Sequence, residues 1–274
     1  MNNDLYIDLI KKTLIDYQKI GYTEYKPLYK NNDTWQLKFA IALDKLFRKN
    51  KLAICKFSQS TIEKRLEGKD WPANADSMVG MKRLDNIEYC FREVVKDNIE
   101  GDFIETGVWR GGATIFMKAL LKAFNITDRK VWVADSFEGL PKPNEEKYKE
   151  DKGDIFHTYE ELAIPLEKVQ YNFKKYDLLD DNVKFLKGWF KDTLPSAPIG
   201  KLSIIRLDGD MYESTMDGLV NLYPKLSKGG FIIIDDWGAV KACKQACLDY
   251  REQHNITDEV NIVDWTGAFW RKGN

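Results

Sequence analysis

From residue 101 onward, short apolar runs rich in β-branched residues alternate with segments whose apolar residues recur every three or four positions. This alternation narrows the possible folds most, because strands separated by helices form βαβ units and a parallel sheet. The last two runs lie too close together for a crossover helix, so we expect an antiparallel hairpin at one edge of the sheet. The predicted strands are DFIET, KVWVADSF, NVKFLKG, LSIIRLDGD and GFIIIDD, followed by the hairpin of EVNIVDW and GAFWRK.

The first hundred residues are predicted to be helical. Residues 4–21, 35–49 and 77–98 carry apolar residues at three- and four-residue spacing, which is typical of amphipathic helices. We therefore expect a helical N-terminal cap over residues 1–75 and one α/β domain over residues 76–274.

The charge balance excludes the partners that a strongly charged protein would attract. The 42 Lys and Arg residues oppose 43 Asp and Glu residues, for a net charge of −1, so no overall field draws in nucleic acid or an anionic membrane. No run reaches the roughly 18 apolar residues that a membrane span requires. The first residues lack the basic and apolar regions of a signal peptide. A cytoplasmic protein without nucleic-acid or membrane partners is therefore predicted.

The four cysteines are too few for a disulfide framework. Cys243 and Cys247 lie one turn apart on a predicted helix, where they could form half of a metal site with His254 as a third ligand. A site needs three or four ligands, however, and Val240 and Tyr250 on the same helical face favour core packing. We expect both cysteines in the core.

One segment interrupts the alternation of strands and helices. Residues 141–162 form a long, charged insertion after the second predicted strand. Loops of this length in compact domains are usually lids, binding loops or disordered segments. Because the insertion follows the carboxyl end of a parallel strand, we expect it to lie over the ligand site as a lid.

Two of the predicted strands end in pairs of carboxylates. LSIIRLDGD ends on Asp208 and Asp210, and GFIIIDD ends on Asp235 and Asp236. Carboxylates that converge must be solvated, paired with cations or bound to a metal. Solvated acids that cap the following helix are the simpler explanation, but a DD pair beside a D-x-D exceeds what capping requires.

The other strand ends indicate a ligand without phosphate. ETGVWRGG after the first strand permits a tight turn, but Trp109 replaces the second glycine of a dinucleotide motif, and Glu105 disfavours a phosphate. Asp135, after the second strand, suits ribose hydroxyls. Trp189 and Phe190, after the third, could hold a flat ring such as adenine. An amine, a ribose and an adenine together describe S-adenosylmethionine, although each signal alone also fits an ordinary turn or core packing.

Several stretches together resemble the macrocin O-methyltransferase (TylF-type) family of class I, metal-dependent sugar O-methyltransferases of natural-product pathways. The resemblance runs from about Met78 to Lys272, and DLYIDLIKK near the start resembles the family too. Residues 21–70 depart from the family pattern and are expected to help shape the acceptor pocket. The matching stretches are DWPANADSMVGMKRLDN, GDFIETGVWRGG, VWVADSFEGLP, DDNVKFLKGWFKDTLPSAP, RLDGDMYESTMDGL and GGFIIIDDW.

The resemblance implies a Rossmann-like class I methyltransferase sheet, S-adenosylmethionine as the methyl donor and a divalent metal, magnesium. It also implies a small-molecule or glycosylated acceptor and a homo-oligomer. The implied metal ligands are Asp208, Asp235 and Asp236. The implied cofactor contacts are Ser77, Met78, Glu105, Thr106, Gly107, Trp109, Arg110, Gly111, Asp135, Ser136, Trp189 and Phe190.

On this basis we expect methylation of a sugar hydroxyl. An acceptor bound to magnesium would present two neighbouring oxygens, which predicts a vicinal diol of a sugar or, alternatively, a catechol. Asp208 is the candidate base that accepts the hydroxyl proton, with Asp210 in reserve. His157 in the insertion could approach the acceptor, as the family's H-x-Y pattern suggests, or could be a surface histidine.

Three other kinds of protein fit part of the pattern. A haloacid-dehalogenase-type phosphatase would need more than the 27 residues that separate Asp208 from Asp235. A metal-dependent nucleotide-sugar glycosyltransferase could use the D-x-D but would not need the acid–glycine turn at residues 105–112. A methyltransferase fold that only binds a partner would not need the complete set of acids and glycines. Adenosyl-ligand binding separates the first two from a methyltransferase, and metal-dependent turnover separates the third.

Overall fold

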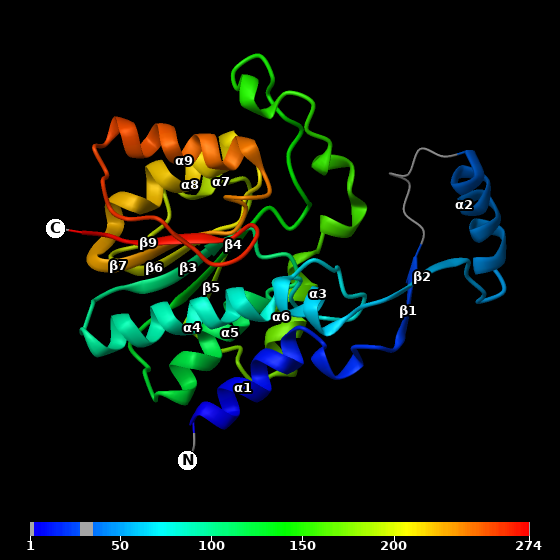
Figure 1. Ribbon diagram of the computed structural model, residues 1–274, viewed down its shortest axis with the longest axis horizontal. Helices are drawn as coiled ribbons and strands as arrows, with labels where there is room; N and C mark the ends of the chain where they lie inside the picture. Colours follow the sequence, from blue (N-terminus) through cyan, green and yellow to red (C-terminus); the bar gives the residue numbers. More distant parts are fainter. Residues whose placement is uncertain (1–2, 28–34, 274) are drawn as a thin grey trace.

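A computed structural model of the chain describes residues 3–27 and 35–273. Helices pack on both faces of a central sheet (Figure 1). The helices are α1 (Asn3–Leu14), α2 (Trp35–Arg48), α3 (Ile62–Glu67), α4 (Met81–Lys96), α5 (Gly112–Ala123), α6 (Leu166–Lys175), α7 (Phe190–Thr193), α8 (Tyr212–Leu222) and α9 (Lys241–Gln253). The strands are β1 (Thr23–Pro27), β2 (Cys55–Gln59), β3 (Asp102–Thr106), β4 (Val131–Asp135), β5 (Val183–Lys187), β6 (Leu202–Leu207), β7 (Leu226–Ile234), β8 (Asn261–Ile262) and β9 (Ala268–Arg271).

The central sheet confirms the predicted α/β fold. Its strand order is β5-β4-β3-β6-β7-β9-β8; β3 to β7 are parallel, and β8 and β9 form the predicted antiparallel hairpin at one edge. β4 and β5 extend the sheet on one side of β3, whereas β6 and β7 extend it on the other. The strand order therefore reverses between β3 and β6, and ligands of such sheets bind at the carboxyl ends of the strands at this reversal.

Each face of the sheet has its own apolar core, because successive side chains of a strand point to opposite faces. Phe103 of β3 packs with α4, α5 and α6 on one face, whereas Ile104 packs with α8 and α9 on the other. Cys243 and Cys247 of α9 are buried in the second core as free thiols, which confirms the prediction that they are core residues. None of the helices in the described part of the chain is long and apolar enough to cross a membrane.

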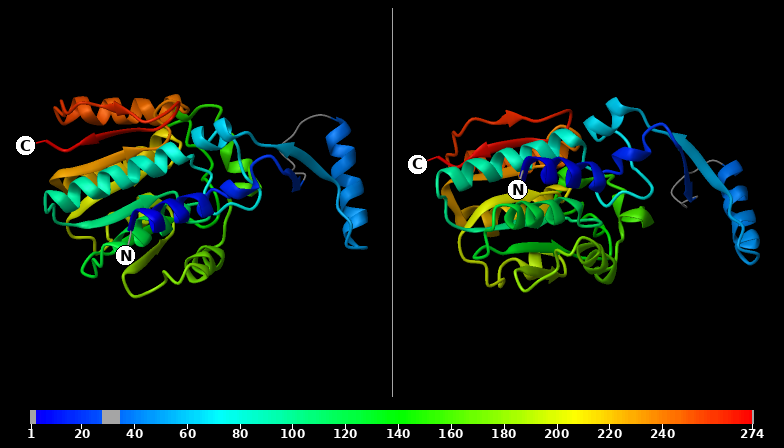
Figure 2. Two further views of the ribbon diagram at one scale, coloured as in Figure 1. Left: turned by 60° about the horizontal axis from the view of Figure 1, so that its bottom comes forward. Right: turned by 90° about the horizontal axis from the view of Figure 1, so that it is seen from below.

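The N-terminal hundred residues contain a feature that the helical prediction missed. The three predicted helices are present as α1, α2 and α4, but β1 and β2 pair as an antiparallel ribbon that carries α2 away from the body (Figures 1 and 2). The strand sequences TEYKP and CKFSQ show no apolar stripe, and β2 has no buried residue. A strand that buries no apolar side chain leaves little periodicity to detect.

Helix α1 lies against the body and not with the ribbon. Ile7, Ile10 and Leu14 are buried in the core cluster that also contains residues of α4 and α5. The predicted division at residues 75 and 76 places α1 with the extension, although its packing joins it to the main core. The division of the chain into two domains stays a prediction.

The carboxyl ends of β3 and β6 approach closely at Gly107. Its φ is +78°, and a Cβ at this position would lie 1.7 Å from the carbonyl oxygen of Asp208. The N–H of Asp208 donates to the carbonyl oxygen of Thr106 at 2.9 Å. A side chain at residue 107 would force apart the two strand ends at which the sheet order reverses, so glycine is required.

Gly107→Ala is expected to lower the unfolding temperature clearly more than Gly153→Ala. Both glycines have a left-handed backbone, but a Cβ at Gly153 would meet no atom within 4 Å. Backbone strain alone should cost Gly153→Ala about 1 kcal/mol, and the added clash should cost Gly107→Ala about 3 kcal/mol or more. Thermal unfolding followed by circular dichroism measures the difference. Equal losses in the two variants would contradict the close-approach argument.

Candidate functional site

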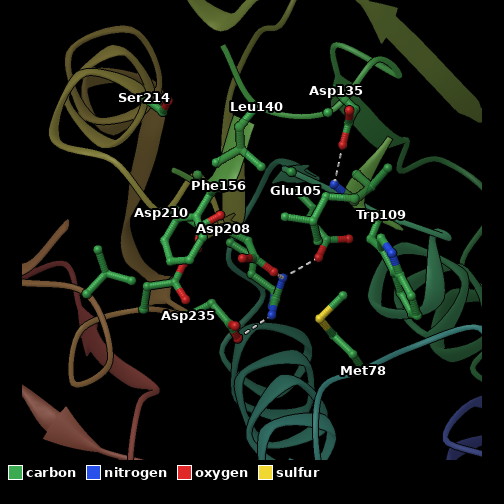
Figure 3. A pocket seen from close by; sticks show the side chains of 18 of the residues that line it. Met78, Glu105, Trp109, Asp135, Leu140, Phe156, Asp208, Asp210, Ser214 and Asp235 are labelled. Carbon is green, nitrogen blue, oxygen red and sulfur yellow. Dashed lines mark hydrogen bonds and ion pairs between the residues drawn. The ribbon is translucent and has the colours of Figure 1, made fainter. Parts of the chain in front are cut away.

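A cavity of about 530 Å³ opens at the carboxyl ends of the central strands (Figure 3). Its volume lies within the usual range for small-molecule sites, roughly 300–1,000 Å³. Twelve of the sixteen predicted site residues line this cavity, and they come from six separate parts of the chain. These residues are Ser77, Met78, Glu105, Gly107, Trp109, Asp135, Ser136, Trp189, Phe190, Asp208, Asp235 and Asp236.

The other four predicted residues do not line the cavity. Thr106 is buried in β3, and Gly111 is the N-cap of α5 with a φ of +86°. The guanidinium of Arg110 donates to the carbonyl oxygens of Ala73 and Ala75 and thereby holds the chain before Ser77. His157 is exposed. The structure thus places the first three in the framework of the site, while His157 stays outside it.

Glu105 occupies the floor of the cavity and is 2% exposed. One of its carboxylate oxygens accepts a hydrogen bond from Arg206, while Oε2 is buried without a hydrogen-bond partner among the described residues. Burial raises the pKa of Glu105 to about 8, against the opposing effect of Arg206. An unpartnered buried carboxylate oxygen costs free energy, so this atom is ready to accept a donor group from a ligand.

Asp135 joins the ends of β3 and β4. Its Oδ2 accepts from the N–H of Val108 and its Oδ1 from the N–H of Phe137, each at 2.7 Å. Burial nevertheless raises the pKa of Asp135. Oδ1 also accepts from the hydroxyl of Ser136 at 3.4 Å. A carboxylate oxygen has two lone pairs, so Oδ2 can hold the glycine turn through Val108 and still accept from a ligand hydroxyl.

Aromatic and sulfur-containing side chains surround the Glu105 side of the cavity. Met78 and Trp109 lie on this side (Figure 3), and Trp189 and Phe190 line the wall beyond β5. The indole N–H of Trp109 donates to the carbonyl oxygen of Glu161 at 2.9 Å. This bond ties the glycine turn to the end of the insertion at residues 141–162.

Part of the insertion borders the cavity, as expected for a lid. Pro141, Lys142, Asn144, Phe156 and Leu162 line it. Figure 3 shows Phe156 beside Asp208 and Asp210. The residue that follows it in the sequence, His157, is exposed. Phe156 was not among the predicted site residues, because a single phenylalanine in a loop carries no chemical signature in the sequence.

Opposite Glu105, four carboxylates gather at the ends of β6 and β7. One oxygen from each of Asp208, Asp210 and Asp236 lies within 4.8 Å of the others. Asp235, which was predicted as the third metal ligand, is not part of this group. Its two oxygens accept hydrogen bonds from Arg83 and Arg206. The predicted ligands therefore share the site with a fourth carboxylate, Asp210.

One buried arginine, Arg206, holds three of the carboxylates together. Arg206 is 1% exposed and donates to Glu105, to Asp208 at 2.8 Å and to Asp235. It is the last but one residue of β6, within the stretch LSIIRLDGD, and it was not predicted as part of the site. An arginine in a buried, mainly apolar strand is a signal that the sequence does offer, because such a charge must be paired.

The carboxylate group carries more negative charge than its arginines neutralise. Burial raises the pKa of Asp208 to about 6 and raises the pKa values of Asp210 and Asp236 well above their usual range, with neighbouring carboxylates adding to the effect. Arg206 and Arg83 lower the pKa of Asp235, although burial opposes them. Oδ2 of Asp236 is buried without a hydrogen-bond partner among the described residues. Closely spaced, uncompensated carboxylate oxygens fit a hard divalent cation.

Comparison with known proteins identifies similar chains. The sequence profile of the family described as macrocin-O-methyltransferase (TylF) matches residues 3–272. The chain is 56% identical over 208 residues to 8-demethyl-8-(2,3-dimethoxy-alpha-L-rhamnosyl)-tetracenomycin-C 4'-O-methyltransferase of Streptomyces olivaceus, covering 76% of this chain and 79% of the relative. It is 49% identical over 213 residues to mycinamicin III 3''-O-methyltransferase of Micromonospora griseorubida, covering 77% and 84%.

Solved structures agree with these sequence matches. The O-methyltransferase NovP superposes with a TM-score of 0.85 at 42% identity and covers all of both chains. The calicheamicin methyltransferase CalS11 superposes with a TM-score of 0.58 at 17% identity, covering 89% of this chain and 95% of that one, which shows a shared fold.

Magnesium is expected to stabilise the protein more at about pH 8 than at about pH 5.5. The raised pKa values leave Asp208, Asp210 and Asp236 partly protonated at low pH, so a cation must displace protons there. At higher pH these groups ionise and repel one another; without a cation they therefore make stability fall as pH rises, because the folded state binds more protons than the unfolded state. The difference in unfolding temperature between magnesium and chelator, followed over this range, tests the prediction. A magnesium effect that does not grow with pH would contradict it.

Proposed function

This chain belongs to the macrocin-O-methyltransferase (TylF) family, and from that membership we propose that it transfers the methyl group of S-adenosylmethionine to a sugar hydroxyl of a natural product or glycoconjugate. The chain is an O-methyltransferase with the class I fold. This identity sets aside the phosphatase, glycosyltransferase and binding-module alternatives. The donor, the acceptor and a magnesium requirement are the proposed parts.

One observation carries the proposal: a single cavity is lined by the carboxylates of Glu105 and Asp135 on one side and has a cluster of acids, Asp208, Asp210 and Asp236, on the other. The first side suits the donor. The second suits an acceptor with two neighbouring oxygens, so we propose a vicinal diol of a sugar. The named relatives, one acting on a rhamnosyl-bearing compound and the other at a 3'' position, support a glycosylated acceptor.

On the donor side, each residue has a chemical match. Oε2 of Glu105 would accept from the ammonium group of the methionine part, since it is buried and has no hydrogen-bond partner in residues 3–27 and 35–273. Asp135 would accept from the ribose hydroxyls. Trp189 and Phe190 would pack on the adenine, and Met78 lines the cavity on the same side.

On the acidic side, we propose that Asp208, Asp235 and Asp236 hold magnesium. The two guanidiniums on Asp235 keep it ionised, as a metal ligand must be, and each of its oxygens keeps a second lone pair. When bound, the cation would lower the pKa of the acceptor hydroxyl, and the donor would supply an electrophilic methyl group.

We reassign the proton acceptor from Asp208 to Asp210. Arg206 donates a hydrogen bond to Asp208 and reduces its affinity for a proton. Among the described residues, no arginine, lysine or histidine forms an ion pair with Asp210. The raised pKa of Asp210 suits a general base, and its left-handed backbone, φ 58°, is the kind of strained geometry that is found at functional sites. Asp210 would accept the proton from the hydroxyl that attacks the methyl group.

The proposal as a whole is tested by incubating the protein with S-adenosylmethionine and a panel of rhamnosylated natural products, with magnesium and with chelator. Methylated product that forms only with magnesium is expected. Calorimetric titration with S-adenosylhomocysteine, in parallel, separates a missing acceptor from a missing donor site. Failure to bind S-adenosylhomocysteine in either condition would refute the donor assignment.

Asp135→Ala is expected to weaken S-adenosylhomocysteine binding by about 1–3 kcal/mol, because it removes hydrogen bonds to the ribose. The change also removes the contacts to Val108 and Phe137. The binding of adenosine and of free methionine to the wild-type protein and to the variant is therefore measured separately, because each is one part of the donor. Loss of adenosine binding without loss of methionine binding supports a ribose contact, whereas equal losses would indicate a collapsed turn.

Asp210→Asn should lower kcat by roughly 10²–10⁴-fold, because a carboxylate that accepts a proton is replaced by an amide. Binding of S-adenosylhomocysteine and the stabilisation by magnesium should persist. Asp236→Asn is the matched comparison, since it should abolish the stabilisation by magnesium. If Asp210→Asn abolishes that stabilisation as well, Asp210 is a metal ligand, as its distance to Asp208 and Asp236 would allow, and the base assignment fails.

We propose further that the protein acts as a homo-oligomer. Its location in the cytoplasm and its lack of nucleic-acid and membrane partners stay predictions.

A further inference from the structure

The arm, defined as residues 23–27 and 35–59, which contain β1, α2, β2 and the connection between α2 and β2, carries large apolar side chains that face solvent in a single copy of the chain. The arm contains about 30 of the 274 residues but holds six of the eighteen exposed large apolar side chains in the described ranges. They are Tyr25, Phe39, Leu46, Phe47, Leu52 and Phe57. An exposed set of this density marks an interaction surface.

These side chains are arranged on common faces. Tyr25 of β1 and Phe57 of β2 stand directly opposite each other in the ribbon and are 68% and 71% exposed. Phe39 and Leu46 are two turns apart on α2, so they share one side of that helix. A two-stranded ribbon and a single helix of 14 residues are marginally stable on their own. The arm therefore needs something to pack against, and α2 lies away from the body in every view (Figures 1 and 2).

Charge indicates what the arm packs against. The arm has seven Lys and Arg residues and two acids, a net charge of +5, in a chain whose total is −1. Its two acids are buried, Glu24 against Arg65 and Asp44 against Arg48, so the surface that the arm presents is basic. The insertion at residues 141–162 has seven acids and four lysines, a net charge of −3.

We propose that the arm of one copy packs against the insertion of a second copy, and reciprocally, in a two-fold dimer. A basic segment and an acidic segment on the same chain are what a self-complementary interface requires, because each copy then supplies both halves. The arm is also of suitable size, since a stable interface uses roughly 20–30 residues from each side.

The acidic insertion argues against nucleic acid as the occupant. Phosphate groups that approached the arm would also meet the carboxylates of the insertion, which projects from the same side of the body (Figure 1).

In the two-fold dimer, the arm of each copy would lie near the cavity of the other. Pro141, Asn144 and Phe156 line it from the insertion, so the partner's arm would support a wall of the acceptor pocket. The expected role of residues 21–70 in that pocket would then be exerted on the other copy.

The oligomeric state is the first test, and it needs neither donor nor metal. Sedimentation velocity of the full chain should show a dimer, and Phe39→Asp with Leu46→Asp should raise its dissociation constant about tenfold or more. Tyr171→Asp is the matched control, because Tyr171 of α6 is 59% exposed on the body. A monomeric wild-type protein, or equal effects of arm and control variants, would overturn the proposal.

Charge reversal tests the pairing of arm and insertion. Lys45→Glu with Lys49→Glu on the arm, and Glu146→Lys with Glu150→Lys on the insertion, should each weaken the dimer about tenfold. A chain with all four changes should recover most of the loss. Additive losses in that chain would show that the arm meets another surface. These residues are exposed, so unchanged unfolding temperatures are expected and serve as the folding control.

Resonance energy transfer between dyes on two copies of the chain tests which surfaces are in contact. Cys55 on β2 is half-exposed, whereas the other three cysteines are buried, so a thiol dye labels the arm selectively. A second population carries the acceptor dye on the insertion through Ile155→Cys with Cys55→Ser. Mixed samples should show transfer that is lost with Phe39→Asp and Leu46→Asp. Dimers that form without such transfer would overturn the assigned contact.

Discussion

The guanidinium of Arg206 is buried among Glu105, Asp208 and Asp235, and the arrangement of the candidate site depends on that contact. These three carboxylates come from three neighbouring strands and would repel one another without a cation between them. Removing one partner from a buried ion pair typically costs about 3–5 kcal/mol, because the remaining charge is left in a poorly solvated place. Arg206 thus fixes the spacing between the side of the cavity that suits the donor and the side that suits the acceptor.

The sheet brings this contact about. β3 and β6 are neighbours at the point where the strand order reverses, and Gly107 lets their ends come close enough for Glu105 and Asp208 to share one arginine. The same closeness concentrates more carboxylates than Arg206 and Arg83 can neutralise. Burial, together with the repulsion between these carboxylates, raises the pKa values of Asp210 and Asp236. The remaining negative charge also fits a divalent cation.

The two segments that stand out from the body are related by charge. The insertion is acidic and borders the cavity, while the arm is basic and apolar and is directed away from the body. Both leave large apolar side chains exposed, such as Phe39 on the arm and Ile155 on the insertion. A contact between copies would satisfy both segments with one interface. It would also connect assembly with the shape of the acceptor pocket.

By itself, the sequence determined the sheet, its antiparallel edge hairpin, the three long N-terminal helices and the family, because each leaves a local pattern of periodicity or motif. Most of the candidate site was also predictable, since its residues follow predicted strands. The ribbon of β1 and β2 escaped because the residue of β1 that is buried, Glu24, is charged, and β2 has no buried residue, so neither strand shows an apolar alternation. Only the tertiary structure decided that Arg206 joins Glu105 to the aspartates, that Asp210 enters the carboxylate group and that His157 stays outside the cavity. These outcomes depend on distances between strand ends and loops far apart in the chain, and no local pattern of residues encodes such distances.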